Sequence, residues 1–182
     1  MKIFAETDRL ILREIEETDI EGMFALDSDP EVHIFLGNNP VKSRDESKMI
    51  IDEIRNQYRD FGIGRWAVID KQNGEFVGWS GLKFERTVRV EFDYYDLGYR
   101  LRKAYWGKGI ATETSRLALA YGFGEMKLEE ICGAAAPANT ASNNVLQKAG
   151  LRFIQNFEYD GETQNWYAIK RSEWEQAQKM TD

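Results

Sequence analysis

The chain has 182 residues, of which 42% are hydrophobic and 30% charged, a balance typical of a single globular domain spanning residues 1–182. Its formal net charge of −7 argues against a nucleic-acid-binding protein, since such proteins need a basic surface. The single cysteine, Cys132, excludes an internal disulfide, and no apolar stretch has the length of a membrane span or a signal peptide. We therefore expect a cytoplasmic protein with no nucleic-acid or membrane partner.

The first half of the chain predicts short helices between strands. The segment RLILREI, at residues 9–15, reads as a first strand. Two capping-box signatures, Thr18 with Glu21 and Ser43 with Glu46, predict the starts of two helices. Further strands are predicted over residues 65–70, 75–84 and 88–101, with Asn73-Gly74 as a hairpin turn and Gly98 as a bulge or a close backbone approach.

The second half predicts a helix, a strand and a second helix, followed by a hairpin. Apolar residues recur at helical spacing from Ile110 to Tyr121. They predict a helix that begins within the sequence YWGKGIATET, residues 105–114. Residues 129–135 read as a strand, and residues 142–149 as a helix that ends at Gly150. Two more strands flank Asp160-Gly161, and a polar helix ends the chain. This order of elements indicates a mixed α+β class.

The stretch WGKGIA, residues 106–111, joins a predicted strand to a predicted helix. Glycines allow close backbone approach, the first helical amides point at an anion, and Lys108 adds positive charge, so the junction is typical of a phosphate site. A Walker A loop is excluded because Gly109 follows the lysine, and a Rossmann fingerprint fails because Thr112 occupies its third small-residue position. An ordinary loop before a helix remains an alternative.

The same stretch resembles the acyl-coenzyme A pyrophosphate loop of the GNAT N-acetyltransferases, Gln/Arg-x-x-Gly-x-Gly/Ala, except at its first position. Farther on, NTASNNVLQKAGLRF at residues 139–153 resembles the family segment Asn-x-x-Ser-x-x-x-Leu-x-Lys-x-Gly-Phe, whose asparagine and serine contact the coenzyme. The segments TDRLILREIEETDIEGMF, FVGWSGL and LGYRLRKAYWGKGIATE are similar to the RimJ/RimL-type branch, so the resemblance covers nearly the whole chain. Simple helix capping is the alternative role for Asn139 and Ser142.

This resemblance implies a GNAT fold within the α+β class. The expected core is a mixed, mostly antiparallel twisted sheet of about seven strands, flanked by helices and splayed between strands four and five, which are residues 88–101 and 129–135. A bulge near residues 98–100 would separate these strands, and acetyl-CoA would enter the opening as cosubstrate, without a metal. The residues expected to bind the coenzyme are Leu101, Arg102, Lys103, Trp106, Gly107, Lys108, Gly109, Ile110, Ala111, Thr112, Asn139, Ser142 and Asn144.

The expected chemistry is direct attack of a neutral primary amine on the thioester, which needs an acceptor for the amine proton. Asp96 is the preferred base, acting through water, with a solvated surface acid as its alternative reading and Glu91 and Asp93 as weaker choices. The resemblance places an oxyanion-binding backbone amide at about Leu101. Many family members use a tyrosine to protonate the thiolate at the position of Leu146, so a serine of the second motif, Ser142, is the substitute donor, unless it only binds coenzyme or caps the helix.

The acceptor follows least directly from the sequence. The branch acetylates protein N-terminal α-amines and assorted small amines, and acidic residues in the segment 91–96 would suit a cationic amine. A non-catalytic acyl-CoA sensor and a polyamine or aminoglycoside acetyltransferase are the alternatives. The only histidine, His33, reads as a surface residue and Cys132 as a core residue. A homodimer is an expectation by analogy with the family only.

Overall fold

A computed structural model describes residues 1–180 of the chain and contains one mixed sheet of eight strands. The strands are β1 (Ile3–Glu6), β2 (Leu10–Glu14), β3 (Trp66–Asp70), β4 (Phe76–Glu85), β5 (Tyr94–Leu101), β6 (Glu130–Ala135), β7 (Arg152–Tyr159) and β8 (Glu162–Lys170). Their order across the sheet is β1-β2-β3-β4-β5-β6-β8-β7. Neighbouring strands are antiparallel except for β5 and β6, which are parallel and joined by a helical crossover.

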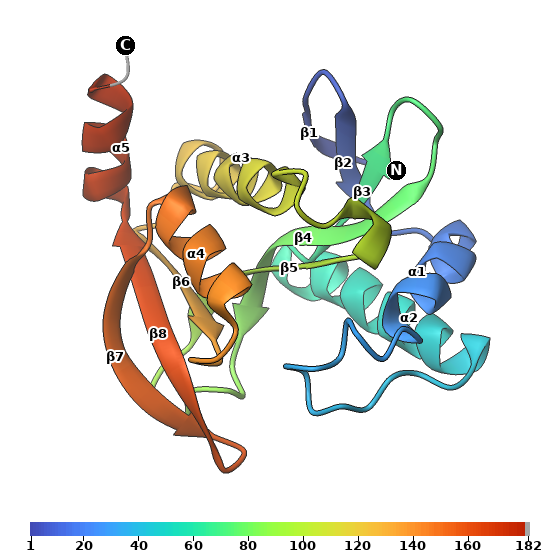
Figure 1. The fold of residues 1–182 in the computed structure, drawn as a ribbon. Helices are drawn as coiled ribbons and strands as arrows, with labels where there is room; N and C mark the ends of the chain where they lie inside the picture. The colour runs from blue at the N-terminus through green and yellow to red at the C-terminus, as the bar shows by residue number, and fades with distance from the viewer. Residues whose placement is uncertain (181–182) are drawn as a thin grey trace.

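Helices cover both faces of this sheet, as Figure 1 shows. They are α1 (Ile20–Asp27), α2 (Arg44–Phe61), α3 (Ile110–Gly124), α4 (Thr140–Ala149) and α5 (Arg171–Lys179), with 3-10 turns η1 (Glu17–Asp19) and η2 (Lys103–Tyr105). Helices α3 and α4 pack on one face through buried residues such as Leu119 and Leu146. Helices α1 and α2 pack on the other face through residues such as Met23 and Ile51. The parallel pair β5–β6 packs against α3 and α4 on one face, through residues such as Leu97 and Ile131, and contributes Tyr94 and Cys132 to a smaller cluster with Trp166 on the other face.

The expected fold class is confirmed, with two differences in detail. The short strand β1, which the sequence pattern did not indicate, raises the strand count from about seven to eight and moves the parallel pair from strands four and five to β5 and β6. The predicted long strand over 88–101 begins only at Tyr94. Since β4 ends at Glu85, directly opposite Tyr94, residues 86–93 form the connection between the two strands.

The predicted turns are confirmed at both hairpins. Gly74 has a φ of 71° between β3 and β4, while Asp160 and Gly161 have φ values of 50° and 76° between β7 and β8. These left-handed values are the ones that favour glycine, asparagine and aspartate in tight turns.

Of the two predicted capping boxes, one forms as a helix cap and the other does not. The Ser43 hydroxyl accepts the Glu46 amide at 3.3 Å where α2 begins. The pairing of Thr18 with Glu21 was wrong, because the chain enters α1 through η1, where the Asp19 carboxylate accepts the Glu16 amide at 2.8 Å. Asp19 is held there by two hydrogen bonds from Arg13.

Candidate active site

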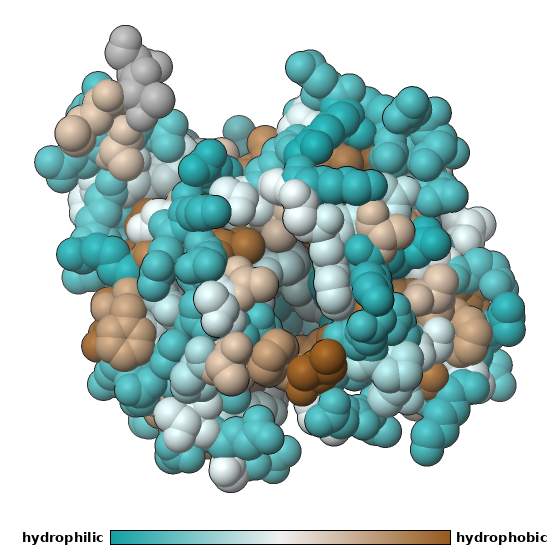
Figure 2. All heavy atoms as spheres, in the orientation of Figure 1, coloured by the Kyte–Doolittle hydropathy of each residue, from teal (hydrophilic) through white to brown (hydrophobic). Residues whose placement is uncertain are grey.

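The site begins where the parallel strands β5 and β6 separate. Their register is defined at Asp96 opposite Cys132, whereas β5 continues on β4 in unbroken register as far as Leu101 opposite Gly78. The prediction of a bulge near residues 98–100 is therefore wrong for the pairing of β5 with β4. Gly98 instead permits a close side-chain approach, since a Cβ there would lie 2.7 Å from the guanidinium of Arg65. Figure 2 shows this face of the molecule hollowed near its middle, between the α4 side and the α1–α2 side.

The glycine loop connects the end of β5, through η2, to the start of α3. Gly107 and Gly109 have φ values of 71° and 75°, in the left-handed region that L-residues with side chains rarely adopt. The first hydrogen bond of the helix runs from the Glu113 amide to the Gly109 carbonyl, at 3.1 Å. By helix geometry, the amides of residues 110–112 precede this first bond and point out of the helix end. The loop thus presents free donors at the positive end of a helix dipole, which is the chemistry of a diphosphate site.

Two long-range contacts hold this loop against the rest of the protein. The indole Nε1 of Trp106 donates to the Leu101 carbonyl at 2.8 Å. Arg9, which precedes β2, donates to the Lys108 carbonyl at 2.9 Å and to the Glu113 carboxylate at 2.9 and 2.5 Å. Arg9 was missed by the sequence analysis, because it lies 99 residues from the carbonyl that it binds.

We expect Arg9→Ala to weaken coenzyme A binding about tenfold, equivalent to about 1.4 kcal/mol. The substitution frees the loop and leaves the negative charge of Glu113 unpaired in the first turn of α3, close to the expected position of the diphosphate. Isothermal titration calorimetry with coenzyme A measures this loss. The double variant Arg9→Ala/Glu113→Gln should recover part of it, since the unpaired charge is gone. An unchanged Kd in the single variant would show that the loop does not depend on Arg9.

Helix α4 starts on the other side of the opening. The Asn139 side chain caps it by accepting the Ser142 amide at 3.1 Å, so the capping role considered from sequence is confirmed for Asn139. The Ser142 hydroxyl lies 3.1 Å from the hydroxyl of Tyr99 on β5. Asn143, missed by the sequence analysis, accepts hydrogen bonds from Asn165 (2.8 Å) and Tyr167 (2.7 Å) and so attaches α4 to β8.

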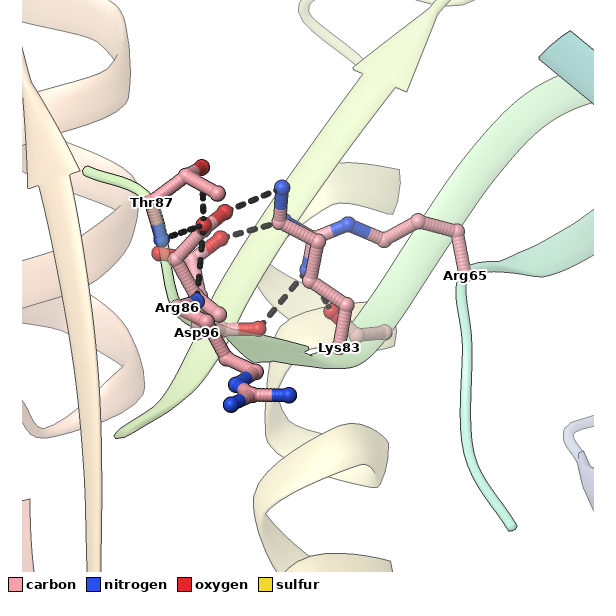
Figure 3. A network of polar contacts seen from close by, with 7 residues as sticks. Arg65, Lys83, Arg86, Thr87 and Asp96 are labelled. Carbon is pink, nitrogen blue, oxygen red and sulfur yellow. Dashed lines mark hydrogen bonds and ion pairs between the residues drawn. The ribbon is translucent and has the colours of Figure 1, made fainter. Parts of the chain in front are cut away.

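Asp96 lies on the face of β5 opposite to Tyr99 and forms an ion pair with Arg65. Figure 3 shows the guanidinium reaching Asp96 from the start of β3. Arg65 also donates to the carbonyls of Gly81 (2.5 Å) and Asp96 (2.7 Å), and its side chain is 8% exposed against 16% for Asp96. Asp96 is thus a partly buried carboxylate with one oxygen engaged by arginine.

A second ion pair joins Lys83 and Glu85 of β4, and it lies beside the first because Lys83 is opposite Asp96 in the β4–β5 pairing. Figure 3 shows Lys83 close to Asp96. Burial disfavours the ionised form of Glu85, but hydrogen bonds from Lys83 and Thr87 outweigh it and lower the pKa of Glu85 to about 2. Glu85 therefore stays ionised throughout the range in which enzymes are assayed, and it is committed to its partners.

Comparison with known proteins places this geometry in a family. The family model described as "Acetyltransferase (GNAT) domain" matches residues 9–152, which is most of the chain. The chain belongs to the GNAT acetyltransferase family. It is an acetyl-CoA-dependent N-acetyltransferase of the RimJ/RimL-like branch.

Individual relatives of this GNAT acetyltransferase span most of its length. It is 32% identical over 193 aligned residues to FsC-acetyl coenzyme A-N(2)-transacetylase of Aspergillus fumigatus, covering 95% of this chain and 78% of that protein. A GNAT-family acetyltransferase of Bacillus anthracis is 26% identical, with a TM-score of 0.75, over 94% of this chain and 99% of that one. RimL, a ribosomal alpha-N-protein acetyltransferase in complex with coenzyme A, shares the fold at 17% identity and a TM-score of 0.77, over 93% and 98% of the two chains.

In this acetyltransferase, the glycine loop fits acetyl-CoA through its backbone amides more than through its basic side chains. Three basic side chains of the loop have protein partners: Lys103 pairs with Glu31, Arg102 donates to the Phe76 carbonyl at 3.1 Å, and Lys108 lies over the Tyr105 ring at 5.0 Å. The amides of residues 110–112 remain free for an anion, and the glycines leave the space in front of them open. Asn144 is exposed on α4, and Thr112 is half-buried in the first turn of α3.

The acidic segment before β5 is neutralised by arginines in this acetyltransferase. Glu91 pairs with Arg89 at 3.1 Å, and Asp93 pairs with Arg86 at 3.5 Å. Asp96 is likewise paired with Arg65. Each of the three acids expected to suit a cationic amine therefore has an arginine of the protein as its partner.

His33 is buried, so its interpretation as a surface residue was wrong. It is 6% exposed, and its Nε2 lies 3.8 Å from the carboxylate of Asp27, which also accepts a 2.5 Å hydrogen bond from Arg100. Burial and the Arg100 charge lower the pKa of His33, so the ring is neutral at pH 7.

Cys132 is buried as expected, and burial raises the pKa of its thiol. Within residues 1–180, none of the helices has the length and apolarity to cross a membrane.

Proposed function

We propose that this enzyme transfers the acetyl group of acetyl-CoA to the α-amine of a peptide or protein N-terminus. The observation that carries the choice of acceptor is the pairing of all three acids of the segment 91–96 with arginines. A polyamine or an aminoglycoside brings several positive charges and needs several free carboxylates to balance them. An N-terminus brings one amine and an otherwise neutral backbone.

The acid–base chemistry also favours an α-amine. An α-amine has a pKa of about 7.7–8.0, against about 10.4 for a lysine-like amine, so a useful fraction is neutral at pH 7 without help. Once the neutral amine attacks the thioester carbonyl, its nitrogen becomes positively charged and far more acidic than before. The carboxylate of Asp96, which Arg65 holds in an ion pair, is then sufficient to accept that proton through a water molecule.

The other residues take the following roles in this proposal. The backbone of the glycine loop holds the diphosphate, and the amide at Leu101 donates to the oxygen that becomes negative during the attack. The Ser142 hydroxyl donates a hydrogen bond to the sulfur as it leaves. Arg65 fixes the carboxylate of Asp96 on the acceptor side of β5.

The test is release of free coenzyme A thiol from acetyl-CoA in the presence of defined acceptors. We expect release with a short peptide that has a free N-terminus and none with the same peptide blocked by an N-acetyl group, which is the matched control. Release that is faster with spermidine or an aminoglycoside would overturn the choice of acceptor and assign the enzyme to small amines. Tight acetyl-CoA binding without release for any amine would instead identify an acyl-CoA sensor.

A further inference from the structure

We propose that Tyr99 and Ser142 form a two-hydroxyl proton relay to the sulfur of coenzyme A, with Ser142 as the direct donor and Tyr99 as the residue that positions and supplies it. The inference rests on the proposed function of this site and adds to it a residue that the sequence motifs did not indicate. Tyr99 lies on β5, on the face that packs against α3 and α4, and its hydroxyl reaches Ser142 at 3.1 Å.

The position of this pair connects the two sides of the opening. Tyr99 lies beyond Asp96, where β5 and β6 have their defined register, on the part of β5 that leads to the glycine loop. Ser142 lies in the first turn of α4, where its amide is fixed by the Asn139 side chain. The hydrogen bond between the two hydroxyls therefore crosses the opening into which the coenzyme is expected to enter. Two hydroxyls from different elements, in direct contact, form the shortest chain along which a proton can move there.

Chemistry gives a reason for the second hydroxyl. A serine hydroxyl is a much weaker acid than a thiol, so Ser142 alone would leave an unstable alkoxide after it gave its proton to a thiolate with a pKa of about 8.5. A phenol, with an ordinary pKa of about 10, is far closer to the thiol. With Tyr99 behind Ser142, the negative charge ends on the phenol oxygen. Burial raises the pKa of Tyr99 and so reduces this advantage, but burial disfavours a serine alkoxide in the same way, so the phenol remains the stronger acid of the two.

Atoms and charges balance in this step. The carbon–sulfur bond breaks and its electron pair goes to sulfur, while the proton of Ser142 Oγ moves to sulfur. The proton of Tyr99 Oη moves to Ser142 Oγ, so serine is unchanged and tyrosine becomes a phenolate. The proton released by the acceptor nitrogen, through solvent, restores the phenol. Burial raises the pKa of Tyr99, so the phenol is fully protonated before each turnover and the relay is loaded at neutral pH.

A purely structural bond between β5 and α4 is the competing role for this contact, and three variants separate the two. Tyr99→Phe removes one hydroxyl, Ser142→Ala removes the other, and the double variant removes both. Tyr95→Phe is the matched control, since Tyr95 lies on the same face of β5 and packs against the same core. For a relay, each single variant should lower kcat about 10²-fold, with the coenzyme Kd and the melting temperature close to wild type. The double variant should be no slower than Ser142→Ala alone, because the two residues act as one unit.

A second measurement does not depend on turnover. The thiol of bound coenzyme A is titrated by the ultraviolet absorbance of its thiolate, with bound desulfo-coenzyme A as the blank for protein tyrosines and Cys132. Hydrogen bonding to the thiolate lowers the thiol pKa, so Tyr99→Phe and Ser142→Ala should each raise it by about one pH unit, and Tyr95→Phe should not.

The outcomes are distinguishable. A Tyr99→Phe enzyme with wild-type kcat overturns the relay while the proposed function stands. A raised coenzyme Kd with an unchanged thiol pKa overturns it in favour of a structural contact. If the wild-type protein acetylates no amine, the proposed function fails, and the thiol titration still decides whether the two hydroxyls serve sulfur.

Discussion

Replacing Asp96 by asparagine is expected to lower kcat for a peptide acceptor about 10²-fold or more, with little change in the KM for acetyl-CoA. Asparagine keeps an oxygen that can accept from Arg65, but it cannot take a proton from the acceptor nitrogen. Stopped assays of thiol release at pH 7, with the peptide and acetyl-CoA varied in turn, measure kcat and the two KM values.

The matched control for this variant is Glu85→Gln. Glu85 is also a buried carboxylate in an ion pair on the same face of the sheet, and its pKa of about 2 keeps it ionised without a role in proton transfer. We expect Glu85→Gln to lower the melting temperature, because Lys83 loses its buried partner, and to leave kcat near the wild-type value. If the Asp96→Asn enzyme behaves like this control, Asp96 only holds Arg65 in place and takes no part in proton transfer.

The local structure of the glycine loop could be predicted because neighbouring residues encode it. A strand, two glycines and a helix start within about a dozen consecutive residues predict the loop, and Gly107 and Gly109 have the left-handed backbone expected of it. Asn139 likewise caps the helix that it immediately precedes. Such features depend on neighbours in the chain, so one sequence is enough to recognise them.

The long-range contacts of the candidate site could not be predicted because they join distant segments. Arg65 is 31 residues from Asp96, and Tyr99 is 43 residues from Ser142. Alternation along a strand gives the face of each side chain, but the partner depends on strand order and register, which a single sequence does not contain. The burial of His33 could not be predicted either, because the loop that contains it has no hydrophobic periodicity to indicate which side chains point inward.

Local propensity also misled where no partner strand was available. Val88 and Val90 favour extended structure, yet Val90 is 92% exposed in the connection between β4 and β5. β-Branched residues stabilise a strand mainly through packing against neighbours, and residues 86–93 have no adjacent strand. Conversely, β1 forms although none of its residues is fully buried, because β2 offers it an antiparallel edge.

In the glycine loop, the effect of a substitution on coenzyme binding can be measured separately from its effect on folding. Gly109→Ala is expected to raise the Kd for coenzyme A about 30-fold, which corresponds to about 2 kcal/mol, the range for hydrogen bonds to a charged group. At φ 75° a residue with a Cβ is strained by about 1–2 kcal/mol, and the loop relieves this strain by moving the amides that follow it. The nearest atom to a Cβ at Gly109 is 3.9 Å away, on Arg9, so no clash in the free protein contributes to the effect.

Gly161→Ala is the control that carries the same backbone strain elsewhere. Gly161 has a φ of 76°, no atom within 4 Å of the point where a Cβ would lie, and a place in the β7–β8 turn, away from the start of α3. Both variants should lose a similar few degrees of melting temperature, but only Gly109→Ala should lose coenzyme affinity in calorimetry. If both lose affinity equally, the backbone amides after Gly109 are not what holds the diphosphate. If neither does, the anion is held by side chains such as Lys108, and the loop glycines serve only to turn the chain.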